Sequence, residues 1–255
     1  MTNTHLYRLP ELALALSLLL LASTALADAK IYRVGLVAQS PPLSFVDETG
    51  KLTGFNVEIA AELCATLKIR CVQQSVVLEK IIDLAAADQI DFAVVGFVDT
   101  PERRARVLFT KTYFQSMTVW LAQPSVPAGK AGSRVVVVKG SAQAKHAHSM
   151  GWNIVEVATS NEIAAVLASG AADAAVLPML NALSVSQDKA LYARGLPAGI
   201  KSTVIEGPEV TGTLHMVVSP RQRELLESLN AAIDQIKRDG RFDRINRKFV
   251  PFSLL

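Results

Sequence analysis

"VVGFVDTPERRARVLFTKTYF", residues 94–114, sets a run of apolar residues against a turn rich in charge. The β-branched and aromatic side chains between Asp91 and Val95 predict a strand, and the Thr100-Pro101 step turns the chain and starts a helix. Arg103 therefore lies just past the carboxyl end of a strand and beside a helix N-terminus, which is where open α/β sheets bind anions. It is either an anion-binding residue or a solvated surface charge, and the rest of the chain has to decide.

Apolar strands alternate with helical segments on both sides of this stretch. Strands are expected at 31–37, 71–77, 134–139, 153–158, 173–177 and 212–218, and helices at 55–67, 78–85, 142–149 and 160–169. Short buried strands that alternate with helices favour a mainly parallel sheet. The pattern occurs twice, before and after a Pro-, Gly- and Ser-rich stretch at 123–133, so we expect two α/β lobes.

The segment after the last of these strands is expected to hold two helices. Ser219 caps and Pro220 opens a long helix that ends at Gly240, and a short helix follows. The two helices are too small for an independent domain, so we expect them to pack on the first lobe. The first lobe then comprises residues 28–118 and 215–255, and the second comprises residues 119–214.

The first 27 residues have the pattern of a secretory signal peptide. Arg8 precedes an apolar run from Leu12 to Leu21, and Ala25-Leu26-Ala27 offers a small-residue cleavage site. An uncleaved membrane anchor is the alternative, but the run is short for a hydrocarbon core of about 30 Å. We expect cleavage near Ala27 and export to the periplasm.

Charge and motif content exclude several classes of function. The formal net charge is only +3, and no basic run is longer than two residues, which argues against a nucleic-acid partner. The sequence has no Gly-rich phosphate loop of the required spacing and no nucleophile-elbow pattern. His146 and His148 lie two apart on a helix and so on different faces, which disfavours a metal pair. We expect no cofactor and no metal.

Two cysteines, Cys64 and Cys71, are the whole cysteine content of the chain. In an exported protein an even pair favours a disulfide, and two buried free thiols are the alternative. Cys64 lies near the end of the amphipathic helix at 55–67, and the chain then turns back into a strand that begins at about Cys71. A bond between them would join the helix to that strand.

Five segments together resemble the extracellular solute-binding proteins, family 3, which serve polar amino-acid ABC transporters. They are PPLSFVDETGKLTGFNVEIAAEL, IDFAVVGFVDTPERRARVLFTKTYF, VVVVKGSA, SGAADAAVL and LNAAIDQIKRDGRFDRINRKF, and they occur in the family's order. The Cys-x6-Cys spacing resembles the histidine-binding branch. The resemblance implies a periplasmic-binding-protein-like fold of type II, with two α/β lobes and central mixed sheets joined by two hinge strands that close on a ligand. It also implies a monomer that delivers its ligand to an inner-membrane ABC permease.

The resemblance assigns the anion end of a ligand pocket to three residues and a contact with the ligand amine to a fourth. Arg103 matches the arginine that binds the ligand α-carboxylate through a paired, charge-assisted contact. Ser141 and the amide of Ala142 match the helix N-terminus of the second lobe that donates to the same carboxylate. Gly96 matches a residue whose carbonyl oxygen meets the ligand amine. The resemblance thus favours the anion-binding role of Arg103.

The amine end departs from the family pattern. Val98 stands where the family places a Ser or Thr, and Pro178 stands where it places the aspartate that pairs with the ligand ammonium. On the first loop, Val37 and Ser40 occupy positions where polar-amino-acid binders have an acid and an aromatic residue. Leu78 falls at an apolar wall position. A buried ammonium without a counter-charge is costly, so we expect a small carboxylate ligand without an obligatory α-ammonium group.

Three functions fit this reading. The first is a transport receptor for a small carboxylate. The second is a periplasmic enzyme that resembles cyclohexadienyl dehydratases, for which Glu79 is the candidate acid, and the sequence leans against it. The third is an accessory or sensory binding protein that acts without transport.

Overall fold

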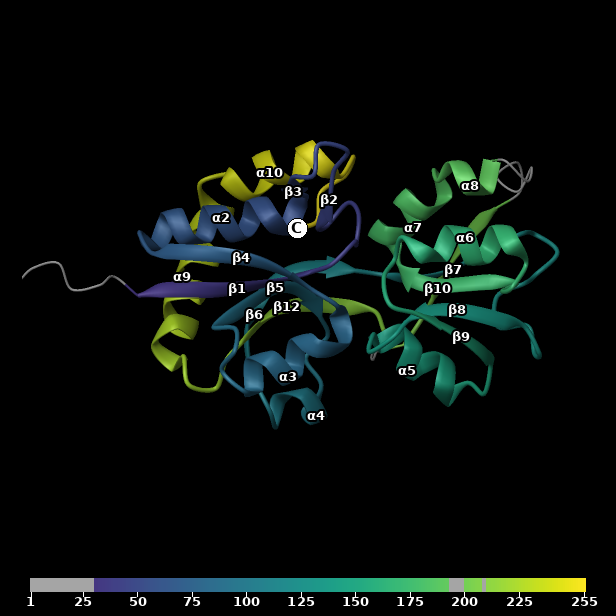
Figure 1. Cartoon of the computed structure of the whole chain (residues 1–255), viewed down its shortest axis with the longest axis horizontal. Helices are drawn as coiled ribbons and strands as arrows, with labels where there is room; N and C mark the ends of the chain where they lie inside the picture. Colours follow the sequence, from purple (N-terminus) through teal and green to yellow (C-terminus); the bar gives the residue numbers. More distant parts are fainter. Residues whose placement is uncertain (1–29, 193–199, 208–209) are drawn as a thin grey trace, which may run out of the picture. The chain divides into compact units, whose positions relative to one another are not determined.

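The computed structural model of the protein describes residues 30–192, 200–207 and 210–255. Within these residues the chain forms two five-stranded sheets and a two-stranded ribbon of β2 (Phe45–Val46) and β3 (Leu52–Thr53) (Figure 1). The predicted α/β fold with two sheet-rich lobes is confirmed. The predicted signal peptide, residues 1–27, lies outside the described residues.

The first sheet has the strand order β4-β1-β5-β12-β6. Its strands are β1 (Ile31–Val37), β4 (Arg70–Val76), β5 (Phe92–Phe97), β6 (Leu108–Ser116) and β12 (Gly212–Val218). β1 is parallel to β5, whereas β12 is antiparallel to both β5 and β6. The sheet is therefore mixed, as the family resemblance implies, and β12 is the strand that runs against the mainly parallel arrangement expected from the alternation of strands and helices.

Helices cover both faces of the first sheet (Figure 1). Along β5, Phe92 and Val94 face a core shared with α2 (Phe55–Leu67), α9 (Arg223–Arg238) and α10 (Arg241–Phe249). Ala93, Val95 and Phe97 face the opposite core, which α3 (Ile81–Ala86) covers after the short helix η2 (Leu78–Lys80). The two-residue period of a strand thus divides one apolar run between two cores, which is why β5 reads as almost continuously hydrophobic.

The second sheet has the strand order β11-β7-β10-β8-β9. Its strands are β7 (Thr118–Ala122), β8 (Arg134–Val138), β9 (Asn153–Val157), β10 (Ala174–Pro178) and β11 (Lys201–Ile205). β8 is parallel to β9 and β10, and β7 is antiparallel to β10 and β11. This sheet is also mixed.

The helices of the second lobe again form two layers. α5 (Ala142–Ser149) covers one face, where Trp120 and Trp152 pack edge to face with ring centroids 5.1 Å apart. α6 (Glu162–Ser169), α7 (Met179–Ser186) and α8 (Lys189–Tyr192) lie on the other face (Figure 1). The sequence did not lead us to expect α7 or α8.

The chain passes between the two sheets twice. β6 ends at Ser116 in the first sheet and β7 begins at Thr118 in the second, and the chain returns between β11 and β12. Leu225, Leu229 and Ile233 of α9 are buried in the core that contains Phe55 of α2. The division at residues 118 and 215 stays a prediction; in the structure Thr118 already belongs to β7 of the second sheet, and β12 of the first sheet begins at Gly212.

The predicted start of the long C-terminal helix is wrong. α9 begins at Arg223 and follows Gln222, not Pro220. The Ser219 hydroxyl, which was expected to cap the helix, instead donates to Asp88 across 2.8 Å, and the Ser219 N–H donates to the carbonyl oxygen of Asp91. Long-range hydrogen bonds therefore outweigh a local capping signal here.

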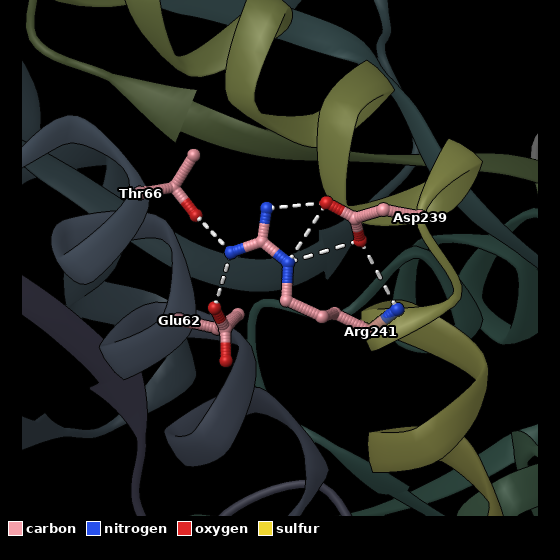
Figure 2. Close-up of polar contacts among 4 residues, drawn as sticks. All are labelled: Glu62, Thr66, Asp239 and Arg241. Atoms are coloured by element: carbon pink, nitrogen blue, oxygen red, sulfur yellow. Dashed lines mark hydrogen bonds and ion pairs between the residues drawn. The ribbon is translucent and has the colours of Figure 1, made fainter.

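Arg241 joins the last helix to α2 (Figure 2). Its guanidinium donates from Nη1 to Glu62 at 2.6 Å and to Thr66 at 2.8 Å, and from Nη2 to Asp239 at 2.6 Å. The carboxylates of Asp239 and Glu62 raise the pKa of Arg241, chiefly through the hydrogen bond to Asp239. The cluster fixes the entry of α10 against the helix that carries Cys64.

Cys64 and Cys71 form the predicted disulfide. Lys68 caps α2 in the left-handed conformation with φ of 54°, and the Ile69 N–H donates back to the carbonyl oxygen of Cys64. This reversal brings β4 alongside the helix it follows, so that the two thiols meet. None of the helices described is both long enough and apolar enough to cross a membrane.

Candidate ligand-binding site

A cavity of about 80 Å³ lies where residues after the carboxyl ends of β1, β5, β8 and β10 converge. Both sheets contribute to its wall. All eight binding residues expected from the sequence line it: Ser40, Leu78, Gly96, Val98, Arg103, Ser141, Ala142 and Pro178. Their binding roles remain predictions, but the fold brings all of them to one place.

Arg103 is held by α4 (Pro101–Arg104) and by neutral partners. Thr100 caps this helix and accepts a hydrogen bond from the Arg103 N–H. The guanidinium donates from Nη1 to the carbonyl oxygen of Val98 at 3.0 Å and lies over the ring of Phe97, with 4.4 Å from Cζ to the ring centroid. Burial lowers the pKa of Arg103, yet an arginine stays protonated at neutral pH. The result is a fixed positive charge at the wall of the cavity.

The N-terminus of α5 forms the adjoining part of the wall. Ser141 is its N-cap, and the Ser141 hydroxyl accepts a hydrogen bond from the Ala144 N–H at 3.0 Å. The first N–H groups of a helix have no intrahelical acceptor, and the helix dipole adds partial positive charge there. Together with Arg103, this arrangement suits an anionic group such as a carboxylate.

The described part of the cavity wall has no carboxylate to balance Arg103. Among the described residues that line it, Arg103 is the one charged side chain, and none is Asp or Glu. Val98 contributes an apolar side chain and uses its carbonyl oxygen to accept from Arg103. Pro178 ends β10 and is the N-cap residue of α7, without a side-chain hydrogen bond.

Sequence reasoning missed three amide side chains that line the cavity. Asn56 accepts a hydrogen bond from the Tyr113 hydroxyl at 3.2 Å, and burial raises the pKa of Tyr113 well above its ordinary value. Gln143 and Asn181 also lie in the wall. Asn56 follows Phe55 at the start of a predicted helix. A polar residue next to the first apolar residue of that helix was the signal in the sequence that could have indicated Asn56. Asn181 belongs to α7, which was not predicted.

Contacts between the two lobes flank Arg103. Arg103 Nη2 donates to the Gly140 carbonyl oxygen at 3.3 Å, Lys139 pairs with Glu79 at 3.0 Å, and Lys145 pairs with Glu102 at 2.5 Å. Glu79 lines a second, more open groove and is absent from the wall of the first cavity. The acid nominated for catalysis therefore lies in an ion pair away from the cavity.

The acidic residues that begin strands have structural partners. Asp91 is buried and pairs with Arg33 at 3.0 Å, and Asp173 pairs with Arg134 at 2.6 Å. In both pairs the carboxylate also accepts from the backbone N–H of the same arginine. Each carboxylate thus connects two neighbouring strands.

Comparison with known proteins places the chain in a family. The model for bacterial extracellular solute-binding proteins, family 3, matches residues 32–252. The chain is 28% identical over 257 residues to the L-arginine-binding protein of Pseudomonas aeruginosa, with 95% of each protein covered. It is 29% identical over 269 residues to the histidine-binding periplasmic protein of Salmonella typhimurium, with 96% of this chain and 98% of that protein covered.

Solved structures agree with this result. An ancestral arginine-binding protein bound to arginine is similar with a TM-score of 0.73 at 28% identity, covering 86% of this chain and 97% of that one. An ancestral amino acid-binding protein described as a precursor of cyclohexadienyl dehydratase shares the fold, with a TM-score of 0.71 at 24% identity and coverage of 86% and 94%. Since the family model spans nearly all of the residues after the predicted leader, the chain belongs to family 3 of the bacterial extracellular solute-binding proteins.

Proposed function

We propose that the protein is a periplasmic binding protein that captures a small amino-acid-like carboxylate and delivers it to an inner-membrane ABC permease. The observation that carries this proposal is the cavity between the two lobes. Its wall combines the single charge of Arg103 with the N-terminus of α5. A carboxylate placed there meets a planar guanidinium and helix N–H groups at once, which are the partners that bind carboxylates well.

The ligand we propose is a carboxylate without an obligatory α-ammonium group. Relatives are named for binding arginine and histidine, which are amino acids, so an amino-acid-like ligand is the shared expectation. In this chain Val98 and Pro178 replace the family's amine partners, and the described cavity wall holds no carboxylate. Burying an ammonium without a counter-charge costs several kcal/mol. A cost of that size would cancel a large part of the binding free energy of a small ligand.

Binding is proposed to close the two lobes. In this proposal the first lobe comprises residues 28–118 and 215–255, and the second comprises residues 119–214. The crossings before β7 and before β12 would act as the hinge. A ligand that contacts both lobes shifts the population toward the closed form in proportion to its extra affinity for that form. We also propose that the protein is exported after cleavage near Ala27 and acts as a monomer.

A thermal-shift screen of amino acids, hydroxy acids, keto acids and aromatic acids tests this function. A ligand present at 100 times its dissociation constant should stabilise the folded protein by about 2.7 kcal/mol. Titration calorimetry of each hit, with matched pairs of an α-amino acid and its deaminated analogue, then tests the missing ammonium site. If amino acids bind far more tightly across those pairs, the ammonium site is present in another form.

The alternatives have less support. A dehydratase would need an acid in the cavity, and Glu79 is paired with Lys139 outside it. Incubation with a cyclohexadienyl carboxylic acid, followed by detection of the aromatic product, would separate enzyme from receptor. An accessory or sensory role predicts a partner other than a permease, which a pull-down with the liganded protein would reveal.

A further inference from the structure

We propose that Asn181 determines specificity by accepting a hydrogen bond from a neutral donor on the ligand. The ligand class is then a carboxylate that carries a hydroxyl or a neutral N–H close to the carboxylate. This inference rests on the proposed function, because it assumes that a carboxylate binds at Arg103. It adds a second recognition point, which the family resemblance did not assign.

The partners of Asn181 fix the orientation of its amide. Nδ2 donates to the Pro41 carbonyl oxygen at 2.9 Å and to the Ser40 hydroxyl oxygen at 3.0 Å. A carbonyl oxygen can only accept, so the amino end of the amide must face Pro41. Oδ1 is therefore the other end, and no N–H or O–H of the described residues donates to it. Asn181 is 3% exposed and lines the cavity, so a ligand held in the cavity can donate to this oxygen.

Gln143 supplies a second acceptor of the same kind. The Thr118 hydroxyl donates to the carbonyl oxygen of Val210, which leaves the hydroxyl oxygen as an acceptor. Gln143 Nε2 donates to it at 2.8 Å, so Oε1 is again the end without a donor from the described residues. Gln143 is buried and lines the same cavity. Two amide oxygens of the cavity wall thus receive no hydrogen bond from the described residues and can accept one from a ligand.

The charge of the cavity favours a neutral donor over an ammonium. Arg103 is the one charged side chain in the described wall. A carboxylate with a hydroxyl is a monoanion and neutralises that charge, whereas a zwitterion leaves the buried site with a net positive charge. Amide oxygens accept hydrogen bonds from both ligands, but they lack the full negative charge that offsets the desolvation of an ammonium.

The same oxygens select against ligands without a donor. A keto oxygen is only an acceptor, so it would leave the oxygen of Asn181 unpaired and face it with like partial charge. A site built to hydrogen-bond a ligand group rejects an analogue that lacks the group, because its own buried polar atoms are then left unsatisfied. The cavity holds only about 80 Å³, so the donor must lie within a few atoms of the carboxylate.

Titration calorimetry with short acids tests the inference. The first set is L- and D-lactate, pyruvate, propionate and alanine, and the second is 3-hydroxybutyrate and butyrate. We expect the hydroxy acid of at least one set to bind at least tenfold more tightly than the acids without a donor, and more tightly than alanine. The same titrations with Arg103→Ala show whether the carboxylate contact is made.

Asn181→Leu is the diagnostic variant, and Asn161→Leu is its control. Asn161 also bridges the lobes, through a hydrogen bond to Gln39 at 3.0 Å, but it does not line the cavity. Asn181→Leu should bring the ratio between hydroxy acid and unsubstituted acid to within about twofold, whereas Asn161→Leu should weaken all ligands equally and keep the ratio.

Each outcome decides a different point. If the wild type binds carboxylates through Arg103 with no preference for a hydroxyl, the inference about Asn181 is wrong and the proposed function stands. The inference is equally wrong if Asn181→Leu lowers all affinities by one factor. If no carboxylate binds the wild type in the full screen, the proposed function fails and this inference fails with it. The wild-type ratios decide the matter even if Asn181→Leu does not fold.

Discussion

Arg103 Nη2 donates a hydrogen bond to the carbonyl oxygen of Gly140 across 3.3 Å and so connects a helix of the first lobe to the turn before α5 in the second. The guanidinium has five N–H groups, and two of them are engaged by the carbonyl oxygens of Val98 and Gly140. No described residue accepts from the other three N–H groups, so they can donate to a carboxylate. One residue can therefore take part in both ligand binding and closure.

Arg103→Ala is expected to remove ligand binding. The loss should be on the order of 2 to 5 kcal/mol, because a charge pair buried in the closed cavity is broken. Arg103→Lys should recover only part of the affinity, since an ammonium cannot make the two-pronged contact of a planar guanidinium. Calorimetry with the best ligand from the screen measures both. Full affinity in Arg103→Lys would contradict a bidentate contact.

Val98→Thr combined with Pro178→Asp is expected to raise affinity for α-amino acids. The new hydroxyl and carboxylate would restore the family's two amine partners. Pro178 is the N-cap of α7 with φ of −58° and ψ of 143°, and aspartate is favoured at that position, so the exchange suits the backbone. The aspartate can also cap α7 instead of meeting the ligand. Matched titrations of the single and double variants separate the two effects: a gain in melting temperature without any gain in amino-acid affinity would show capping alone.

Removal of the disulfide should lower stability without loss of the fold. The bond closes a loop with a sequence separation of 7, for which the chain-entropy model gives roughly 2 to 3 kcal/mol. Urea unfolding of a Cys64→Ser, Cys71→Ser double variant measures this difference. Mass spectrometry of unreduced protein should find the two residues joined, and two freely alkylatable thiols in exported protein would contradict the bond.

Gly140→Ala should weaken ligand binding more than a glycine-to-alanine exchange with the same backbone strain elsewhere in the chain. Gly140 has φ of +76°, and a Cβ there would lie 2.7 Å from the Cα of Glu79 in the opposite lobe. Gly151→Ala is the matched control, because Gly151 has φ of +66° with no atom within 4 Å of a built Cβ. Both variants should lose about 1 to 2 kcal/mol of stability from the left-handed conformation. Only Gly140→Ala should also bind ligand less tightly. Equal affinities in the two variants would show that the close contact between Gly140 and Glu79 does not limit closure of the lobes.

Stability should fall as the pH drops below about 4. A hydrogen bond donated by Arg134 lowers the pKa of Asp173, and one donated by Arg241 lowers the pKa of Asp239. A carboxyl group whose folded pKa lies below its unfolded value of about 3.9 stabilises the fold above that pH. The contribution is lost as the pH falls through the folded pKa. Urea unfolding between pH 5 and pH 2.5 should show the decline, and Asp173→Asn should make its slope shallower. An unchanged slope in that variant would mean that Asp173 has no depressed pKa.

Local sequence pattern predicted most of the elements and the residues at the anion end of the cavity. The helix expected at 55–67 has those bounds, and α6 ends at Ser169, where the predicted helix ends, with Gly170 in the left-handed conformation after it. Apolar periodicity and glycine punctuation act over a few residues, so they can be read from the chain directly. The order of five segments then identified the family, which the family model confirms.

Contacts between residues far apart in the chain explain why the start of α9 was predicted wrongly and why α7 was not predicted. Ser219 bonds to Asp88 in the folded chain, so the capping signal at 219 and 220 did not set the start of α9. α7 follows Pro178 directly in a stretch of mixed polarity, and its Asn181 enters the cavity wall only because α7 packs against the loop at Ser40. No local pattern encodes such a contact.

The sequence by itself determined the fold class, the disulfide pair, the family and the place of Arg103 after a strand, because each depends on residue types at short spacings or on motif order. Only the tertiary structure decided that β12 runs antiparallel to β5, that Glu79 lies outside the cavity wall in a pair with Lys139, and that the cavity-lining amides of Asn181 and Gln143 donate from their nitrogens to Pro41 and Thr118. These features depend on partners that are far away in the chain. Which end of an amide faces a ligand is set by the hydrogen bonds that hold its other end, and those bonds exist only once the chain has folded.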